Sequence, residues 1–146
     1  MKFKDFYVGQ RLQAGPYEVT EAEILQFAKA YGPQWFHTDP QAAAKGRFGG
    51  LIASGWHTCG IAMRLMADAV LQGSESFASP GLDYIKWRQP VRPGDALSVT
   101  AEVLETRRSQ SQPHLGLLLW RWQVFTAQGV EVLDLQATGL FDIGLP

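Results

Sequence analysis

The chain has 146 residues, which corresponds to one domain, and a domain of this size buries roughly 70% of the surface of its unfolded chain. Hydrophobic residues make up 46% of it and charged residues 18%, so its composition is that of a globular protein rather than a disordered one. A net charge of −1 provides no basic field for nucleic acid. The single cysteine, Cys59, excludes an intrachain disulfide and fits a reducing compartment.

The N-terminal sequence "MKFKDFYVGQ" is too polar for a signal peptide. No apolar run approaches the roughly 18 residues that a membrane helix needs. We therefore expect a cytoplasmic protein without a nucleic-acid or membrane partner.

The first helical pattern begins at Thr20. Thr20 and Glu23 have the spacing of a capping box, in which each side chain accepts a hydrogen bond from the other residue's backbone amide. Apolar residues then recur at helical spacing up to Tyr31, and Gly32 followed by Pro33 ends the pattern.

A loop containing His37 leads to the next helix start, an Asp39-Pro40 pair that places an N-cap before a proline at the first helical position. This short helix is expected to run through Ala44 and to end near Gly46.

The glycine-rich stretch "GRFGGLIASG" leads into the longest helical segment, roughly Gly55 to Leu71. Apolar residues cover most of its circumference, and only His57, Arg64 and Asp68 mark a polar stripe. A helix that is apolar nearly all round is buried rather than laid on a surface.

After Pro80 the hydrophobic period changes to two, and several runs have one apolar and one polar face, as in an antiparallel sheet packed on one side. The apolar positions of these runs are Ile85, Trp87, Leu97, Val99, Ala101, Val103, Trp120, Trp122, Val124, Leu133, Leu135, Ala137, Gly139 and Phe141. We predict an α+β fold over residues 1–146, in which a long curved antiparallel sheet wraps around one buried helix and both halves share one core.

Three motifs carry a family resemblance: "FHTDPQAA", "FGGLIASGWHT" and "VRPGDALSVTAEVLE". In this order and spacing, over nearly the whole chain, they resemble the MaoC-like dehydratases of the hotdog fold, which include the (R)-specific enoyl-CoA hydratases. In that family, an Asp and a His five residues apart hold a water and add it across the double bond of a 2-enoyl thioester. A backbone amide at the start of the buried helix polarises the thioester carbonyl. Hydration requires such convergent acid–base groups and a fixed donor for the enolate oxygen.

The resemblance implies that His37 is the family histidine and that the backbone amide of Gly55 is the oxyanion donor. Gly32 occupies the position of the family aspartate, because the family pattern "YDPQPFHTDP" reads "YGPQWFHTDP" here. Half of the acid–base pair is therefore missing. Gln34 can hydrogen-bond a water but cannot accept its proton.

Other residues beside the expected site are candidates for substrate binding. Trp35, Ser54 and Trp56 join Gln34 in this group, and the two tryptophans could narrow an acyl pocket. Lys45 and Arg47 are the basic residues nearest in sequence that could meet the phosphates of the ligand.

The remaining polar residues have simpler interpretations. Asp39 is expected to be an N-cap, and His57 a neutral, hydrogen-bonded core histidine rather than a second base. Asp68 pairs with Arg64 at i,i+4, although its alternative role is the helix carboxylate of hotdog thioesterases. Cys59 is expected to be core packing rather than a nucleophile.

Three functions follow from the sequence. The first is an enoyl-CoA hydratase or dehydratase, a lyase, whose activity is impaired or altered by the missing aspartate. The alternative is a non-catalytic acyl-thioester binding protein or the inactive subunit of an assembly, and the third is a hotdog thioesterase. All three imply an acyl-CoA or acyl-carrier-protein thioester as partner, with no cofactor and no metal. The free edge of the curved sheet needs covering and hotdog proteins of this length pair their sheets edge to edge, so we expect a homodimer or higher homo-oligomer. The sequence leaves the acyl chain length and the thiol carrier open.

Overall fold

The computed structural model describes residues 1–146. The strands are β1 (Arg11–Glu18), β2 (Ser76–Trp87), β3 (Ala96–Arg108), β4 (Leu115–Phe125) and β5 (Glu131–Asp142). The helices are α1 (Glu21–Tyr31), α2 (Trp35–Thr38), α3 (Pro40–Ala44) and α4 (Gly55–Met66), with a 3-10 turn at Phe3–Asp5 and a π-helical turn at Ala67–Leu71. No helix combines the length and the apolarity that spanning a bilayer would require.

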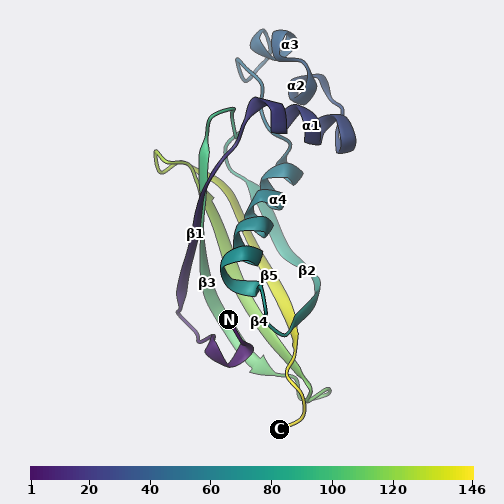
Figure 1. The fold of residues 1–146 in the computed structure, drawn as a ribbon, viewed down its shortest axis with the longest axis vertical. Helices are drawn as coiled ribbons and strands as arrows, with labels where there is room; N and C mark the ends of the chain where they lie inside the picture. The colour runs from purple at the N-terminus through teal and green to yellow at the C-terminus, as the bar shows by residue number, and fades with distance from the viewer.

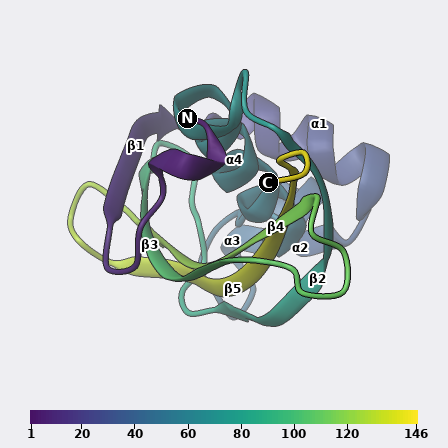
Figure 2. The same ribbon diagram turned by 90° about the horizontal axis from the view of Figure 1, so that it is seen from below.

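The five strands form one antiparallel sheet in the order β1-β3-β4-β5-β2. Figure 1 shows α4 lying along the sheet, with α1, α2 and α3 grouped beyond the N-terminal end of α4. Seen from below, the strands curve around α4 (Figure 2). The predicted α+β fold, a curved antiparallel sheet wrapped around one helix, is confirmed.

The period-two patterns of the second half place apolar side chains against α4. In β3, alternate residues from Leu97 to Val103 are buried, and Ala101 and Val103 pair with Trp122 and Trp120 of β4. One hydrophobic core contains residues of both halves of the chain, as predicted.

The sequence did not predict β1, although it pairs with β3 along the edge of the sheet. Its alternation is short, and the register with β3 shifts between Ala14 and Tyr17, around Gly15 and Pro16. This irregular stretch interrupts the period that identifies a strand.

The predicted burial of α4 on all sides is wrong for the single chain. Trp56 and Met63 of α4 are 63% and 46% exposed, whereas His57, assigned to the polar stripe, is buried. The predicted end at Leu71 is reached, but the last turn is π-helical, with Gln72 N–H donating to Ala67 O at 2.8 Å.

The capping box at the start of α1 forms only in part. The Thr20 hydroxyl accepts from Glu23 N–H at 3.2 Å. The Glu23 carboxylate instead lies 2.8 Å from His57 Nε2 and accepts a 2.8 Å hydrogen bond from the Tyr17 hydroxyl. Glu23 therefore joins α1 to α4 and β1 rather than closing its own helix.

Candidate active site

His37 lies on α2, a single helical turn that sequence reasoning treated as loop. Its backbone N–H donates to Gln34 O at 2.9 Å. Asp39 caps the next helix as predicted, accepting from the amides of Gln41 and Ala42 at 3.1 and 3.0 Å. The two short helices hold the histidine in a fixed turn.

The ring of His37 has a defined tautomer. The residue is 7% exposed, and its Nδ1 lies 2.7 Å from Ile52 O. Because a carbonyl oxygen only accepts, Nδ1 carries the proton and the neutral ring keeps its lone pair on Nε2. Nε2 has no partner in the chain and keeps some contact with solvent, so it can accept a proton from a bound water.

The N-terminus of α4 supplies unpaired backbone donors beside this ring. Ser54 is the N-cap residue, and the N–H of Gly55 donates to no group of the chain. The first amides of a helix have no intrahelical acceptor, and the helix dipole favours negative charge at that end. This end can therefore stabilise an oxyanion.

A cavity of about 470 Å³ brings these groups together. Of the residues expected in the site, His37, Gln34, Ser54, Gly55 and Trp56 line it. The other lining residues are Phe48, Ile52, Ala53, Thr58, Trp87, Arg88, Gln89, Pro90 and Val91. No aspartate or glutamate lines the cavity, so its wall supplies no carboxylate.

Gly32 itself is not part of the cavity wall. It follows α1 with φ −160° and ψ 64°, and a Cβ built on it would meet no atom within 4 Å. The position therefore has room for a side chain.

Sequence reasoning missed Trp87, which comes from the end of β2 and lies over the start of α4. A Cβ on Gly55 would lie 2.5 Å from the Trp87 indole, so only glycine fits beneath it. The rings of Trp87 and Trp56 meet edge to face with centroids 5.3 Å apart. The alternation in the sequence placed Trp87 on the apolar face of its strand. Nothing in the local sequence indicates that this strand ends beside the start of α4.

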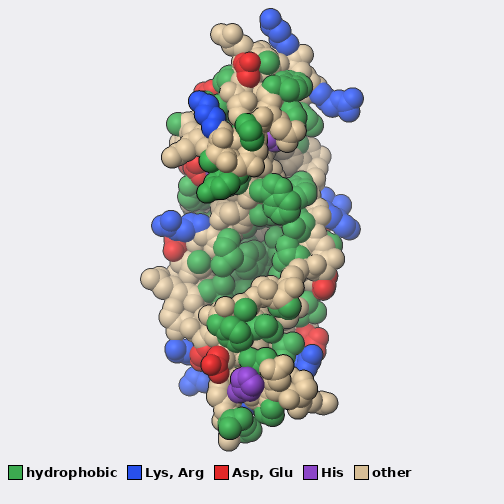
Figure 3. Space-filling model, turned by 90° about the vertical axis from the view of Figure 1, so that its right-hand side faces the viewer, with side chains coloured by type: hydrophobic (Ala, Val, Ile, Leu, Met, Phe, Trp, Pro, Cys, Tyr) green, Lys and Arg blue, Asp and Glu red, His purple; other side chains and the backbone are tan.

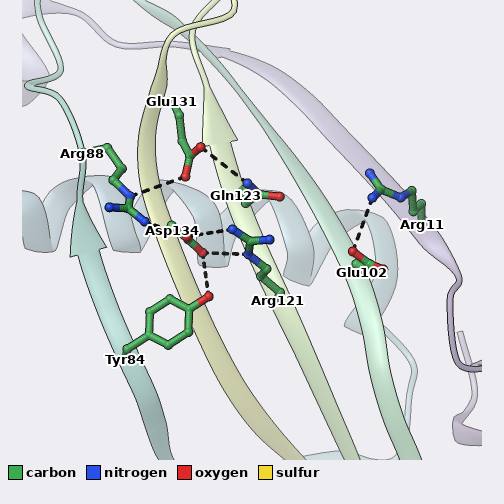
Figure 4. Close-up of polar contacts among 8 residues, drawn as sticks. All are labelled: Arg11, Tyr84, Arg88, Glu102, Arg121, Gln123, Glu131 and Asp134. Atoms are coloured by element: carbon green, nitrogen blue, oxygen red, sulfur yellow. Dashed lines mark hydrogen bonds and ion pairs between the residues drawn. The ribbon is translucent and has the colours of Figure 1, made fainter.

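Arg88, also missed, reaches the cavity from the residue after β2 and belongs to a polar network on the outer face of the sheet. Its Nη2 lies 3.4 Å from Asp134 Oδ2, and the Arg121 guanidinium donates to both oxygens of the same carboxylate at 3.0 and 2.9 Å (Figure 4). Tyr84 adds a 2.9 Å hydrogen bond. Asp134 was expected on the polar face of β5 and lies there. It is nevertheless buried, because its three partners cover it.

This network changes the acidity of its central group. Hydrogen bonding from Arg121 is the largest cause that lowers the pKa of Asp134 to about 2, with Tyr84 and Arg88 acting in the same direction against the effect of burial. The carboxylate therefore remains charged and holds Arg88 in place.

Three residues expected near the ligand lie elsewhere. Trp35 is 52% exposed and packs against Gly46, where it lines a separate hollow together with Arg47. Lys45 is exposed and, like Trp35 and Arg47, does not line the cavity of His37.

The other polar residues have structural partners. His57 is buried, stacks on Phe27 with ring centroids 4.7 Å apart, and lies outside the cavity of His37. Arg64 and Asp68 form the predicted i,i+4 pair at 2.7 Å on an exposed surface.

A second cavity, of about 440 Å³, lies between α4 and the strands β2, β4 and β5. Its wall is mainly apolar, and Figure 3 shows a hydrophobic hollow in the middle of this side of the molecule. Cys59, expected in the core, lines this cavity; burial raises the pKa of its thiol, and Trp87 offsets part of that rise.

The structure defines a hotdog protein whose histidine lies with the free amides of the central helix in one cavity. The sequence model of the family described as "MaoC like domain" matches residues 5–117, and the chain belongs to this family of acyl-thioester dehydratase type. The MaoC-like dehydratase of Rhodospirillum rubrum superposes with a TM-score of 0.88 and 34% identity, over 95% of this chain and 94% of that one.

Two sequence relatives extend the comparison. The uncharacterized protein YdeM of Bacillus subtilis is 31% identical over 92% of this chain and 94% of its own length. The 3-hydroxyacyl-thioester dehydratase Z of Mycobacterium tuberculosis is 33% identical over 59% of this chain and 58% of its own length.

Proposed function

We propose that the chain is an acyl-thioester hydratase or dehydratase in which His37 is the only acid–base side chain of the site. The observation that carries this proposal is the tautomer of His37, fixed by Ile52 O, with its free Nε2 in the same cavity as the unpaired Gly55 amide. The 3-hydroxyacyl-thioester dehydratase named above supports the substrate class.

The reaction follows from these two groups. Nε2 of His37 accepts a proton from water while the water oxygen bonds to C3 of a 2-enoyl thioester. The electron pair of the double bond moves to the thioester oxygen, which the Gly55 N–H stabilises as an enolate. The imidazolium then returns its proton to C2, which completes the addition of water, and dehydration is the reverse sequence.

A histidine that works alone must move the proton of the water without a second acid or base. A positioned acid or base contributes roughly 10² to 10⁴ in rate, so turnover should be slow relative to an enzyme with the complete pair. Gln34 lines the cavity and can donate to the water or accept from it.

The test measures hydration of crotonyl-CoA beside direct calorimetric binding of the same thioester. The parent should bind it and hydrate it slowly, and His37→Gln should bind it with similar affinity while losing at least about tenfold of the turnover. Equal turnover by the parent and by His37→Gln would exclude this function.

The second candidate is a non-catalytic acyl-thioester binding protein or an inactive subunit, and the absence of any carboxylate from the cavity wall favours it. Crotonyl-CoA binding without measurable turnover would select it. A thioesterase that uses Asp68 has less support, because Asp68 is exposed, paired with Arg64 and outside the cavity.

For the phosphates of the thiol carrier, we propose Arg88 and Arg92 in place of Lys45 and Arg47. Arg88 lines the cavity, and Arg92 donates a 2.6 Å hydrogen bond to the carbonyl of Phe48, another lining residue. Both side chains therefore lie in the wall of this cavity or against one of its lining residues.

A further inference from the structure

We propose that Trp56 and Trp87 form a gate between the cavity of His37 and the apolar cavity beside β2, so that the chain accepts short acyl groups and excludes long ones. This inference rests on the proposed function and names its substrate class.

The two cavities share a single wall residue. Trp56 lines both of them, and every other wall residue of this pair of cavities lines only one of the two. The apolar cavity has a volume of about 440 Å³, within the range of small-molecule pockets. It is larger than the apolar hollow of about 230 Å³ that adjoins the site at Phe48, so a long acyl chain would be most stable in it.

One face of α4 leads from the first cavity to the second. Gly55, Cys59 and Met63 are spaced four residues apart and share this face. Gly55 lines the cavity of His37, whereas Cys59 and Met63 line the apolar cavity. An acyl group with its carbonyl at the Gly55 amide would follow this face toward Met63.

The two indoles stand across that path. Trp87 lies over Gly55 so closely that a Cβ there would be 2.5 Å from its ring, and Trp56 meets Trp87 edge to face at 5.3 Å between centroids. An acyl chain that grows along this face of α4 meets the two indoles, and each methylene beyond them would have to displace an indole.

The gate has a measurable signature in binding. Burial of one methylene is worth about fourfold in affinity, or about 0.8 kcal/mol, so an open path rewards a longer chain and a closed path does not. The parent should therefore bind octanoyl-CoA no more tightly than butyryl-CoA. Removal of either indole should let the four additional methylenes reach the apolar cavity.

The experiment measures calorimetric Kd values of butyryl-CoA and octanoyl-CoA for the parent, Trp56→Ala and Trp87→Leu. Each variant should increase the preference for octanoyl-CoA over butyryl-CoA by at least about tenfold. Met63→Ala is the matched control, because it enlarges the apolar cavity and leaves both indoles in place; its preference should stay within about twofold of the parent. Light scattering and thermal melting check that each variant keeps the assembly and fold of the parent.

The outcomes separate the gate from the function. If the parent binds butyryl-CoA and both folded variants keep its preference, the gate is wrong and the proposed function stands. A parent that already prefers octanoyl-CoA by tenfold or more also overturns the gate, and this measurement needs no variant to fold. If neither thioester binds the parent or any variant at millimolar concentration, the proposed function fails and the gate fails with it.

Discussion

Residues 32 and 37 are the two positions on which the proposed reaction depends. The environment of His37 suits the proposed base, because Ile52 O holds one ring nitrogen and the other is free. Gly32 has no side chain and no neighbour that supplies a carboxylate to the cavity. The five-residue spacing of the expected pair is kept, but Gly32 stands at the position where the resemblance implies an aspartate.

Gly32→Asp should increase hydration of crotonyl-CoA by about tenfold or more, because a second positioned group can orient the water. The site tolerates the change: a Cβ meets nothing within 4 Å, and φ −160° is an extended value open to any residue. Steady-state kinetics on the parent and the variant measure the gain.

Two controls accompany this substitution. Gly32→Asn adds a side chain of the same shape that cannot accept a proton from water, and it should not reproduce the gain. His37→Gln in the Gly32→Asp background should abolish it. A folded Gly32→Asp protein that binds crotonyl-CoA and hydrates it no faster than the parent would mean that the missing aspartate is not the limiting defect.

Asp134 makes a pH-dependent contribution to stability. Its pKa of about 2 lies below the ordinary value of 3.8, so the contribution is fully present above pH 3.8 and is lost as pH falls through about 2. The side chain is 3% exposed, and the shift corresponds to about 2 kcal/mol. Asp134→Asn should therefore lower the free energy of unfolding by about 2 kcal/mol at pH 7, as measured by urea denaturation, and by much less near pH 2.

The control for this measurement is another charge pair of the same sheet (Figure 4). Glu102 lies 3.4 Å from Arg11, whose side chain is 65% exposed, so Glu102→Gln should change stability by less than about 1 kcal/mol. A loss in Asp134→Asn that is equally large at pH 2 and pH 7 would contradict an ionic origin.

The residues of the site differ in how well the sequence identifies them. His37, Ser54 and Gly55 lie within the motifs and Gln34 lies two residues before one, and the structure places all four in one cavity. Trp87 belongs to the site only because β2 ends at the start of α4. That contact is set by tertiary packing, which no local spacing encodes.

At the scale of elements, long and regular hydrophobic periods predicted the secondary structure well, whereas short or irregular periods did not. The patterns of β3, β4 and β5 and the N-cap at Asp39 appear as expected. β1 was missed because its alternation is interrupted, and α2 because a single turn carries no period. The exposed side of α4 could not be predicted, since apolar residues surround the helix and only the sheet decides which of them are covered.

The contact between α1 and α4 holds the segment that carries His37. Glu23 of α1 contacts His57 of α4 and Tyr17 of β1, and the C-terminal end of α1 leads to the turn of His37. Nδ1 of His57 already has no partner. Glu23→Ala would leave a buried ring without any hydrogen bond, at a cost of about 1–3 kcal/mol in the free energy of unfolding.

The measurement is urea denaturation with hydrogen exchange of α1 and α2. Exchange should accelerate in both helices, and hydration of crotonyl-CoA should decrease, because His37 is less well positioned. Glu21→Ala, an exposed residue of the same first turn, should stay within about 0.5 kcal/mol of the parent. A similar small change in Glu23→Ala would show that the contact does not hold α1.

The two edges of the sheet differ in what they expose. β1 shows charged residues, Arg11 and Glu18, at its ends. On the β2 side, Phe77 and Leu82 are 57% and 43% exposed, and the apolar hollow continues from β2 to α4 (Figure 3). Exposed apolar surface of this extent beside an unpaired strand edge marks an interaction site.

We predict that a second copy of the chain pairs with the edge of β2 and lies against the exposed face of α4, forming a homodimer that closes the apolar cavity from outside and leaves its interior to the acyl chain. Light scattering at micromolar concentration should give twice 16.2 kDa, about 32 kDa. Leu82→Arg would bury an unpaired charge at the contact and should shift the mass toward the monomer. Gln13→Arg places the same charge on the exposed β1 edge and should leave the mass unchanged. A parent mass near 16 kDa would exclude the homodimer, and a dimer that survives Leu82→Arg but not Gln13→Arg would move the interface to β1.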